Sequence, residues 1–440
     1  MSNLSRLRCA TDDQATEAML WRATAHPAPP CSELIGTHEA DVAIIGAGFT
    51  GLSAALHLAE AGKHVAVLDA HQAGWGASGR NGGQVNPGFK VLPSQLLTSY
   101  GQTRGRYLIG LAQTACDVTF SLIDRLAIEC EARRPGYVQG SIGARGLVAR
   151  DAWVNDWRRE GAEVEPLTRR AISDLLGTKR YCGGYLDHRG GSLQPLSYAR
   201  GLAAAAQSEG AHLFGDTPVL EIKQAAGSDW QLTTPKGYVT APNVVIATNA
   251  YGGAIWPGLK ESVVPVRTFI AATDPLPGPL RDKVLPGGHA VSETRRVQVY
   301  YRMDAEGRFI IGGRGNRTNS KPNGSVDHLH QEACALFPAL NGIDWPYAWN
   351  GLVAMNLTHI PSLVRLDRGV YSALGYNGRG VAMATVMGRE LASLVKTPEG
   401  QSASPLEIPA PIPFHRFRQA GVTYRLTIGA VLDRLDQARQ

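Results

Sequence analysis

Three glycines near the start of the chain follow the spacing G-x-G-x-x-G, from Gly46 to Gly51. In such a loop the first glycine permits a tight turn, the second lets the backbone approach a pyrophosphate, and the third lets a helix pack against a strand. The N-terminus of that helix adds unpaired N–H donors and a partial positive charge. Asp69 lies 18 residues after Gly51, where an acid accepts hydrogen bonds from a ribose. The pattern predicts a dinucleotide site formed by Gly46, Gly48, Phe49, Thr50, Gly51, Asp69 and Ala70.

Two further glycine-rich loops indicate which dinucleotide binds. Residues 78–84 (Ser-Gly-Arg-Asn-Gly-Gly-Gln) and 375–380 (Gly-Tyr-Asn-Gly-Arg-Gly) combine small residues with hydrogen-bond donors. Such loops can lie against a large planar ring. The second loop precedes a predicted helix, whose N-terminus would stabilise a ring that becomes negative on reduction. A flavin gains such charge and a nicotinamide does not, so the three loops together favour FAD over NAD.

The residues that contact substrate have weaker signals. Tyr300 lies on a predicted hairpin and offers an aromatic face that can shape an amine pocket. Arg302 and Arg314 flank the same hairpin, and either can bind a carboxylate through paired hydrogen bonds. These three residues are the catalytic candidates, with ordinary strand packing and solvated or ion-paired arginines as the alternative interpretation. No Cys/His cluster has zinc spacing, so no metal site is predicted.

These loops require a particular set of elements to hold them. Residues 41–45 form a short apolar run before the first glycine loop, residues 52–61 carry apolar side chains at helical spacing, and residues 64–69 form a second apolar run. Together they predict a right-handed βαβ unit. Residues 243–247 are again apolar and are assigned to the same sheet, and helices are predicted over 196–209 and 381–394.

The remaining segments interleave with this unit. Residues 93–133 have helical periodicity, residues 137–149 are strand-like, and 211–222, 229–234 and 237–247 indicate successive strands. The predicted fold is α/β, a doubly wound, Rossmann-like FAD-binding domain with an interleaved α+β substrate domain that contains a mixed or antiparallel sheet. The expected divisions are a lead-in (1–33), the FAD-binding domain (34–92, 192–258 and 345–395), the substrate domain (93–191 and 259–344) and a tail (396–440).

The tail is predicted to contain a short helix. Ile428, Val431, Leu432 and Leu435 lie at helical spacing, and this stripe is expected to pack against the protein itself rather than against a membrane or a partner.

Composition excludes several classes of protein. The 440 residues are 44% hydrophobic and 19% charged, which supports a sizeable core and excludes wholesale disorder. The net charge of +6 includes no long basic run, so nucleic acid is not expected as a partner. Residues 42–59 are uncharged but contain three glycines, so no integral membrane segment is expected. Six cysteines without a CxxC motif predict free thiols and a cytoplasmic location.

The motifs resemble those of the D-amino-acid oxidase/glycine-oxidase superfamily of FAD-dependent enzymes. The resemblance rests on residues 40–55, 74–84 and 375–381, is strongest to the gamma-glutamylputrescine oxidoreductase branch, and extends over nearly the whole chain. It implies that further residues contact FAD: Ser78, Arg80, Asn81, Gly82, Gly83 and Gln84 beside the flavin, Val219 at the adenine, Thr248 and Asn249 near the pyrophosphate, and Gly375, Asn377, Gly378, Arg379, Gly380 and Val381 at the pyrimidine end.

Two departures from the sarcosine-oxidase relatives bear on the chemistry. Those relatives carry a late cysteine that bonds to the flavin, whereas no cysteine follows Cys334 here, so non-covalent FAD is expected. They also carry a lysine on a substrate-domain strand that promotes reaction with oxygen. The comparable strand here reads Phe309-Ile-Ile311, which puts fast use of oxygen in question.

The resemblance implies an oxidoreductase that oxidises the C–N bond of a small amine or amino acid, such as a gamma-glutamylputrescine-like amine. Hydride transfer to the flavin would give an imine and then an aldehyde, with O2 reduced to H2O2. A dehydrogenase with a quinone or carrier acceptor is the alternative, and an NAD-dependent dehydrogenase or a nucleotide-binding sensor is a more distant one. The amine and the oligomeric state stay open.

Overall fold

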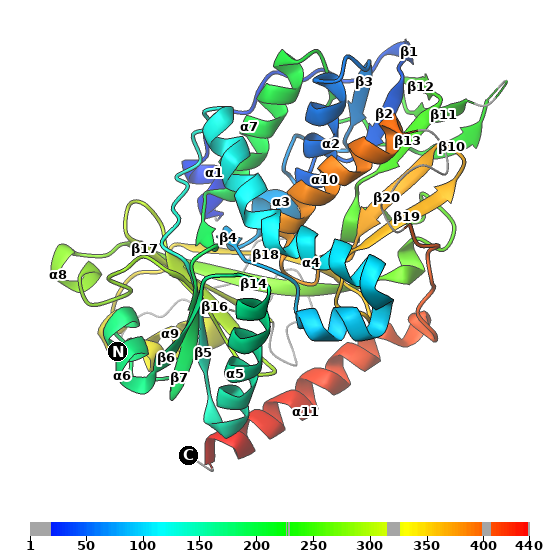
Figure 1. Cartoon of the computed structure of the whole chain (residues 1–440). Helices are drawn as coiled ribbons and strands as arrows, with labels where there is room; N and C mark the ends of the chain where they lie inside the picture. Colours follow the sequence, from blue (N-terminus) through cyan, green and yellow to red (C-terminus); the bar gives the residue numbers. More distant parts are fainter. Residues whose placement is uncertain (1–18, 226, 228, 315–325, 398–405, 439–440) are drawn as a thin grey trace.

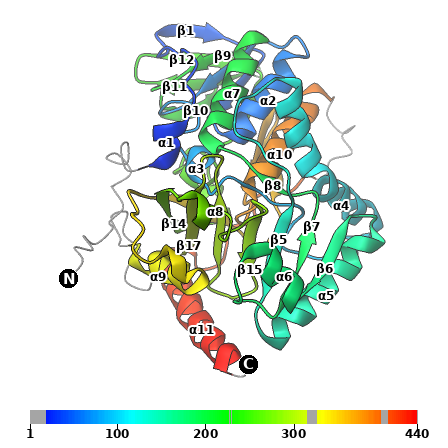
Figure 2. The ribbon, with the colours of Figure 1, turned by 90° about the vertical axis from the view of Figure 1, so that its left-hand side faces the viewer.

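A computed structural model describes residues 19–225, 227, 229–314, 326–397 and 406–438. Two large sheets organise these residues, with a six-stranded sheet and its helices in the upper half of Figure 1 and an eight-stranded sheet in the lower half. Figure 2 shows the same two halves from the side.

The six-stranded sheet is the doubly wound sheet that the sequence predicts. Its order is β19-β20-β13-β2-β3-β9, and all neighbours are parallel except β19 with β20. Every residue of β2 and β3 is buried, as expected for parallel strands covered on both faces. The strands are β2 (Val42–Ile45), β3 (Val65–Leu68), β9 (His212–Phe214), β13 (Asn243–Ile246), β19 (Ser362–Asp367) and β20 (Val370–Leu374).

The prediction of one long strand over residues 211–222 is wrong. The structure has the short β9 there, and the next strand, β10 (Glu221–Gln224), belongs to a different sheet. Asp216 adopts a left-handed backbone with φ +49°, and Pro218 follows it, so the chain cannot continue as one strand. β10 joins β1 (Gly36–Glu39), β11 (Trp230–Thr234) and β12 (Gly237–Ala241) in a four-stranded sheet.

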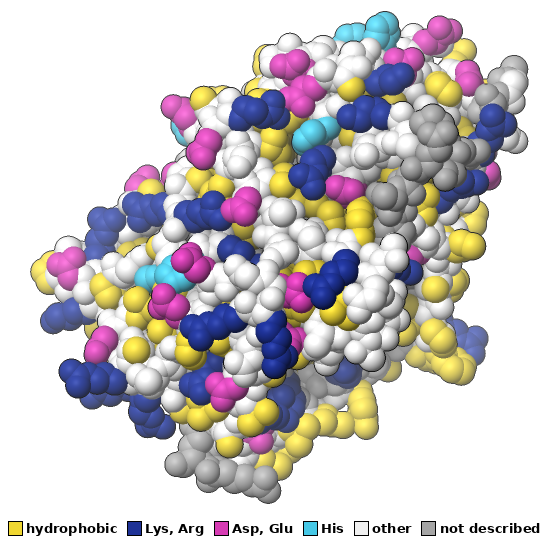
Figure 3. Space-filling model, viewed as in Figure 1, with side chains coloured by type: hydrophobic (Ala, Val, Ile, Leu, Met, Phe, Trp, Pro, Cys, Tyr) yellow, Lys and Arg dark blue, Asp and Glu magenta, His cyan; other side chains and the backbone are white. Residues whose placement is uncertain are grey.

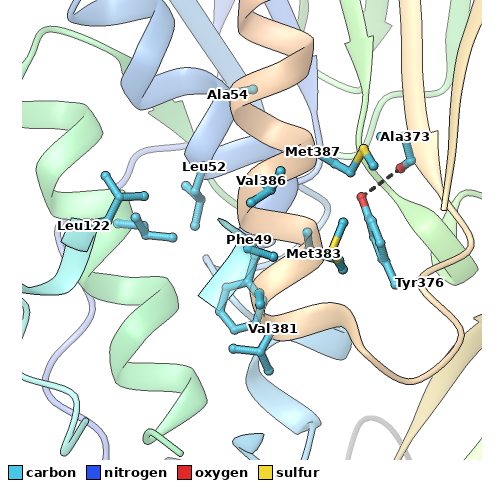
Figure 4. Close-up of a cluster of buried hydrophobic side chains, with 14 of the residues drawn as sticks. Phe49, Leu52, Ala54, Leu122, Ala373, Tyr376, Val381, Met383, Val386 and Met387 are labelled. Carbon is cyan, nitrogen blue, oxygen red and sulfur yellow. Dashed lines mark hydrogen bonds between the residues drawn. The ribbon is translucent and has the colours of Figure 1, made fainter. Parts of the chain in front are cut away.

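Helices α2 (Phe49–Ala59) and α10 (Gly380–Lys396) pack closely beside the six-stranded sheet. A Cβ at Gly388 would lie 2.4 Å from the carbonyl oxygen of Thr50, so only glycine permits this approach. Figure 4 shows the buried side chains between the two helices, with Leu122 of α4 (Pro93–Arg125) next to them. α4 is kinked at Gly101 (φ +71°) and shares this hydrophobic core. α7 (Pro195–Ser208) and the short α1 (Leu20–Thr24) complete this half.

The eight-stranded sheet is mixed, with the order β18-β14-β17-β16-β15-β5-β7-β6 and a single parallel pair, β15 with β5, among the described pairings. β18 comes from the segment assigned to the FAD-binding domain, yet it pairs with β14 here, and the division into domains stays a prediction. The strands are β5 (Tyr137–Ser141), β6 (Val164–Thr168), β7 (Gly183–Asp187), β14 (Val264–Pro275), β15 (Ala290–Glu293), β16 (Val299–Met303), β17 (Arg308–Arg314) and β18 (Tyr347–Met355).

The strand predicted over 137–149 ends early. β5 stops at Ser141, and α5 (Gly143–Arg159) begins two residues later. Gly143 has φ +68°, which turns the chain out of the sheet, and Gly146 then lies against the backbone of Ser141. Helices α6 (Arg169–Leu176), α8 (Gly278–Arg281) and α9 (Asp327–Leu336) lie around the sheet.

The tail contains α11 (Arg418–Ala438), which is longer than the predicted short helix. It runs along the base of the molecule in Figures 1 and 2. Among the described residues, no helix combines the length and the apolar character needed to cross a bilayer. The remaining elements are α3 (Ala77–Arg80), the two-stranded pair β4 (Gln84–Val85) and β8 (Gly191–Ser192), and the 3-10 turns η1 (Asn249–Tyr251), η2 (Lys260–Ser262), η3 (Pro338–Leu340) and η4 (His415–Phe417).

Candidate active site

A cavity of about 1060 Å³ is lined by residues from both large sheets. This volume is at the upper end of the ~300–1,000 Å³ range of small-molecule sites, as a large cofactor together with a substrate requires. Most of the sequence-predicted site residues line it: Gly46, Gly48, Phe49, Thr50, Asp69, Ala70, Ser78, Arg80, Asn81, Gly82, Gln84, Val219, Thr248, Asn249, Asn377, Gly378, Arg379, Gly380, Val381, Tyr300 and Arg314. Four predicted residues are not part of its lining: Gly51, Gly83, Gly375 and Arg302.

The first glycine loop has the shape that a pyrophosphate requires. Gly46 has φ +107°, and a Cβ there would lie 3.0 Å from the carbonyl oxygen of Ala247. A Cβ at Gly48 would lie 2.9 Å from Ser78 Oγ, and one at Gly51 only 1.9 Å from the carbonyl oxygen of Gly46. Gly51 therefore acts by letting α2 pack against the loop, and Gly46 and Gly48 leave the backbone bare toward the cavity.

Asp69 directly follows β3, at the edge of this loop. Its carboxylate accepts hydrogen bonds from the backbone N–H groups of Ala47 (2.6 Å) and His71 (2.9 Å), which fixes it beside the glycines. Burial raises the pKa of Asp69, and these two backbone donors oppose that effect. The position is the one expected for an acid that binds a ribose.

Hydrogen bonds from two indole side chains hold the loop of residues 80–83 in place. Trp349 Nε1 donates to the carbonyl of Arg80 (2.9 Å), and Trp21 Nε1 donates to that of Asn81 (2.7 Å). The two indoles also contact each other edge to face, with centroids 5.6 Å apart. The Asn81 side chain in turn accepts from the N–H of Gly83 (2.7 Å). The backbone of this loop is therefore fixed before any ligand arrives.

Arg302 supports this loop and does not face the cavity. Its Nε donates to the carbonyl of Gly82 (2.7 Å) and its Nη2 to that of Leu193 (2.8 Å), while the guanidinium lies over the Trp21 ring. Burial lowers the pKa of Arg302 to about 10. The geometry does not support the predicted role of Arg302 as a catalytic residue, because its donors are engaged by backbone carbonyls.

Tyr300 does lie on the cavity wall. Its ring packs over two glycines, so that a Cβ at Gly82 would come within 2.7 Å of Cε2 and one at Gly312 within 2.3 Å of Cζ. Burial raises the pKa of Tyr300 to about 12, so the phenol is neutral at physiological pH. The aromatic face therefore adjoins the loop predicted to line the flavin.

The third glycine loop is braced by asparagines. Asn377 has a left-handed backbone (φ +55°), and its Oδ1 accepts from the N–H of Asn356 (3.0 Å). Asn249 Oδ1 accepts from the N–H of Gly375 (3.1 Å), which ties this loop to the end of β13. Arg379 lies over the rings of Trp153 and Tyr137, with its guanidinium carbon 5.1 Å and 5.8 Å from their centroids.

Positive charge predominates on the cavity wall. Only two acids, Asp69 and Glu293, are among its described lining residues, and Arg295 pairs with Glu293. Seven lining residues are basic: Arg80, Lys90, Arg145, Arg295, Arg296, Arg314 and Arg379.

Lys90 and Arg314 are distinct within this set. No acidic group of the described residues acts on either side chain. Burial lowers the pKa of Lys90 to about 7, and the charges of Arg379 and Arg314 act in the same direction. A Cβ at Gly378 would lie 3.8 Å from Lys90 Nζ, so this amine adjoins the third glycine loop. The Lys90 side chain is nonetheless exposed to water in the cavity, which opposes the desolvation that lowers its pKa.

The polar lining fits a dinucleotide cofactor. Thr248 Oγ1 and Asn86 Oδ1 are buried on the wall without a hydrogen-bond partner among the residues that the structure describes, and ligand atoms would satisfy them. No cysteine is among the described lining residues, and non-covalent binding of FAD stays a prediction. The five cysteines in the described part of the chain are free thiols.

Sequence reasoning missed several residues that the fold brings to this site. Lys90 lies in a segment without a motif, Tyr251 follows a strand end, and Trp21 belongs to the polar lead-in. His359 also lines the cavity, in a left-handed backbone conformation (φ +58°). Burial lowers the pKa of its imidazole, and the charge of Lys90 adds a smaller effect in the same direction. Lys90, Tyr251 and Trp21 had no local signal beyond their residue types.

Comparison with known proteins identifies relatives over most of the chain. Residues 41–394 match the family described as DAO, FAD dependent oxidoreductase. The chain is 33% identical over 420 residues to a probable oxidoreductase OrdL of Rhizobium meliloti, covering 94% of this chain and 97% of the relative. It is 33% identical over 379 residues to gamma-glutamylputrescine oxidoreductase of Escherichia coli, covering 86% and 88%.

Solved structures give the same fold. Glycine oxidase of Geobacillus kaustophilus superposes with a TM-score of 0.71 at 23% identity, covering 84% of this chain and 99% of that one. The L-proline dehydrogenase of P. horikoshii gives a TM-score of 0.71 at 19% identity, covering 88% and 99%. The chain therefore belongs to the DAO family of FAD-dependent oxidoreductases, and FAD is its cofactor.

Proposed function

We propose that this enzyme oxidises the C–N bond of an amine that also carries a carboxylate, such as a gamma-glutamylated diamine, and that O2 is the electron acceptor. One observation carries the proposal. A single cavity is lined by the glycine loops together with Tyr300, Arg314 and Lys90, and Tyr300 and Lys90 lie directly beside the second and third loops. When bound, FAD accepts a hydride from the carbon next to the nitrogen, and water then hydrolyses the imine.

The protein side chains have separate tasks in this proposal. Arg314 and Lys90 bind the substrate carboxylate, because neither has an acidic partner among the described residues. The Tyr300 ring bounds the amine and stabilises the positive charge that develops there. Enclosure among basic groups favours the neutral amine, which is the form with a lone pair to expel the hydride.

The choice of substrate class draws on the relatives as well. One relative is named gamma-glutamylputrescine oxidoreductase, and another, glycine oxidase, is 25% identical over 378 residues. A gamma-glutamylated amine and an amino acid share a carboxylate and an oxidisable C–N bond. The cationic side chains of Arg314 and Lys90 on the cavity wall support both.

The acceptor is argued from charge. A cation beside the reacting ring favours the reduction of O2, because oxygen becomes negative as it gains electrons. The strand segment Phe309–Ile311 is buried and carries no such charge, but Lys90 supplies one from a different segment. A quinone or a carrier protein is the alternative acceptor. Free thiols in the described part of the chain support the cytoplasm as the proposed compartment.

The test is a panel of amines and amino acids, scored by anaerobic bleaching of the flavin band at about 450 nm. We expect carboxylate-bearing amines to bleach the flavin faster than equivalent amines without a carboxylate. Arg314→Met should remove this preference, and Arg170→Met, at a surface position, is the matched control. Equal bleaching by both classes of amine would contradict the proposed substrate.

The acceptor is tested separately by measuring peroxide formed per amine consumed in air. We expect one peroxide per amine oxidised. A large deficit of peroxide, with turnover restored by a soluble quinone, would reject oxygen and favour the dehydrogenase.

A further inference from the structure

An apolar stripe of α11 faces solvent. Tyr424, Val431 and Leu435 are 67%, 51% and 50% exposed, and Ile428 and Leu432 lie beside them. At about 100° per residue these five side chains fall within an arc of about 100° on the helix. Figure 3 shows hydrophobic side chains along the lower edge of the molecule, where α11 lies. The expectation that this stripe packs against the protein itself is therefore wrong.

A different face of α11 attaches it to the protein. Asp433 accepts hydrogen bonds from the backbone N–H groups of Arg296 (3.1 Å) and Val297 (3.0 Å) and from the Arg296 side chain (3.0 Å). Asp436 pairs with Arg296 (2.8 Å) and Arg145 (3.5 Å). With both acids bound to the body of the protein, the helix cannot rotate to bury the apolar stripe without breaking these contacts.

The charges left on the outer side of α11 all have one sign. Both of its acids, Asp433 and Asp436, are paired with arginines of the protein body. Arg434 has an exposed side chain beside the apolar stripe, and the preceding turn adds Arg416. Arg425, on the other side of the stripe, is also exposed, but its charge acts on Arg314 and His359 of the cavity as well. A second copy of this chain would present the same cations against the stripe, so self-association brings like charges together. The stripe matches an apolar surface that carries negative charge.

We propose that α11 docks this protein on an anionic lipid surface, with its apolar stripe in the headgroup layer and its arginines on the lipid phosphates. An exposed apolar face bordered by cations is the pattern of helices that lie in a membrane interface. The match to the family ends at residue 394, so α11 lies outside the part of the chain that the family fold accounts for.

The docked surface is adjacent to the active-site cavity. Arg145 and Arg296, which hold the acids of α11, also line that cavity. Docking through α11 would therefore bring one side of the cavity close to the lipid headgroups. The inference does not depend on the identity of the amine or of the electron acceptor.

The test is co-sedimentation of the FAD-loaded full chain with vesicles. Vesicles of phosphatidylcholine with and without phosphatidylglycerol separate a charge-dependent surface from an apolar one. We expect binding to the anionic vesicles, little binding to the neutral ones, and release at high salt. Each arginine near the surface contributes about 1 kcal/mol, or roughly five-fold, so Arg416→Gln with Arg434→Gln should weaken binding about 25-fold.

The apolar stripe is tested by the variant Val431→Ser with Leu435→Ser. Ile35→Ser with Leu220→Ser is the control, because those side chains are 77% and 61% exposed in other parts of the molecule. We expect the stripe variant to lose vesicle binding and the control to keep it, with flavin content and amine oxidation in solution unchanged in both. The flavin spectrum verifies that each variant is folded.

Three outcomes would overturn the proposal. The first is failure of the unmodified chain to bind anionic vesicles at low salt, and the second is equal binding by the stripe variant. The third is a concentration-dependent dimer, measured by light scattering, that the stripe substitutions abolish and that does not bind lipid. That result would assign the stripe to a second copy of this chain.

Discussion

Replacing Arg302 by methionine distinguishes between two roles for this residue, support of the Gly82 loop and binding of the substrate. Its guanidinium donates to the carbonyls of Gly82 and Leu193, at 2.7 and 2.8 Å, and holds the loop predicted to line the flavin. Hydrogen bonds from a charged donor contribute about 1.5–3 kcal/mol each, and removing a buried charge returns part of that. We expect Arg302→Met to lower the free energy of unfolding by about 2–4 kcal/mol.

The loosened loop should also weaken FAD binding, by about 10–100-fold in Kd, or roughly 1.4–2.8 kcal/mol. FAD titration of the apoprotein measures this, and steady-state kinetics at saturating FAD measures KM for the amine. We expect KM to change little for Arg302→Met and to rise for Arg314→Met, which lines the cavity. An Arg302 variant with normal FAD affinity and a raised KM would contradict the role of Arg302 in supporting the loop. It would instead favour the role first predicted, in which Arg302 binds the substrate.

Substitutions at three other residues test the site. With the pKa of Lys90 lowered to about 7, the positive charge of Lys90 is lost as pH rises through that value. KM for a carboxylate-bearing substrate should therefore rise above about pH 7, and Lys90→Gln should remove this rise. A pH profile of KM that is the same in the variant and the unmodified enzyme would contradict this expectation. Between about pH 7 and the ordinary Lys pKa of 10.5 the unfolded chain holds the proton more tightly, so this group makes the apoprotein more stable as pH rises, which urea titration measures. Gly51→Ala places a Cβ 1.9 Å from the carbonyl of Gly46 and should abolish FAD retention during purification, read from the flavin absorbance; a fully loaded variant would show that the loop can open. Tyr300→Phe keeps the ring face and should change kcat/KM by less than about three-fold, whereas Tyr300→Leu should lower it about ten-fold or more; equal effects would show that the aromatic face is not used.

The cofactor loops could be predicted because each is a contiguous motif with its own backbone requirement. Gly46 through Gly51 must turn and admit a helix within six residues, and the structure has both the turn at Gly46 and the close approach of the helix at Gly51. The N–H groups of Ala47 and Phe49 are bonded to Asp69 and Ser78, so the N–H donors predicted for a pyrophosphate stay a prediction. The adjoining strands were equally local, since β2 and β3 are uninterrupted apolar runs.

Residues without a motif could not be predicted in this way. Lys90 and Trp21 reach the site only because distant segments fold next to each other, and neither has a neighbour in sequence that indicates its role. Strand alternation correctly places Tyr300 and Arg302 on the same face of β16, since both contact the Gly82 loop. Alternation does not predict how far along β16 the cavity extends. Tyr300 lines the cavity, whereas Arg302, two residues later, does not.

Arg302, Arg314 and Lys90 differ in how the protein accommodates their positive charges, and this difference supports the part of the cavity proposed to bind the substrate. A buried charge without a partner is costly, so a fold normally pairs it, bonds it to carbonyls or lowers its pKa. Arg302 is bonded to carbonyls, and its charge is thereby used within the protein. Arg314 and Lys90 have no such partner among the described residues, and they repel each other. An anion bound between these two like charges would relieve their repulsion, and this supports the proposal that the substrate carries a carboxylate.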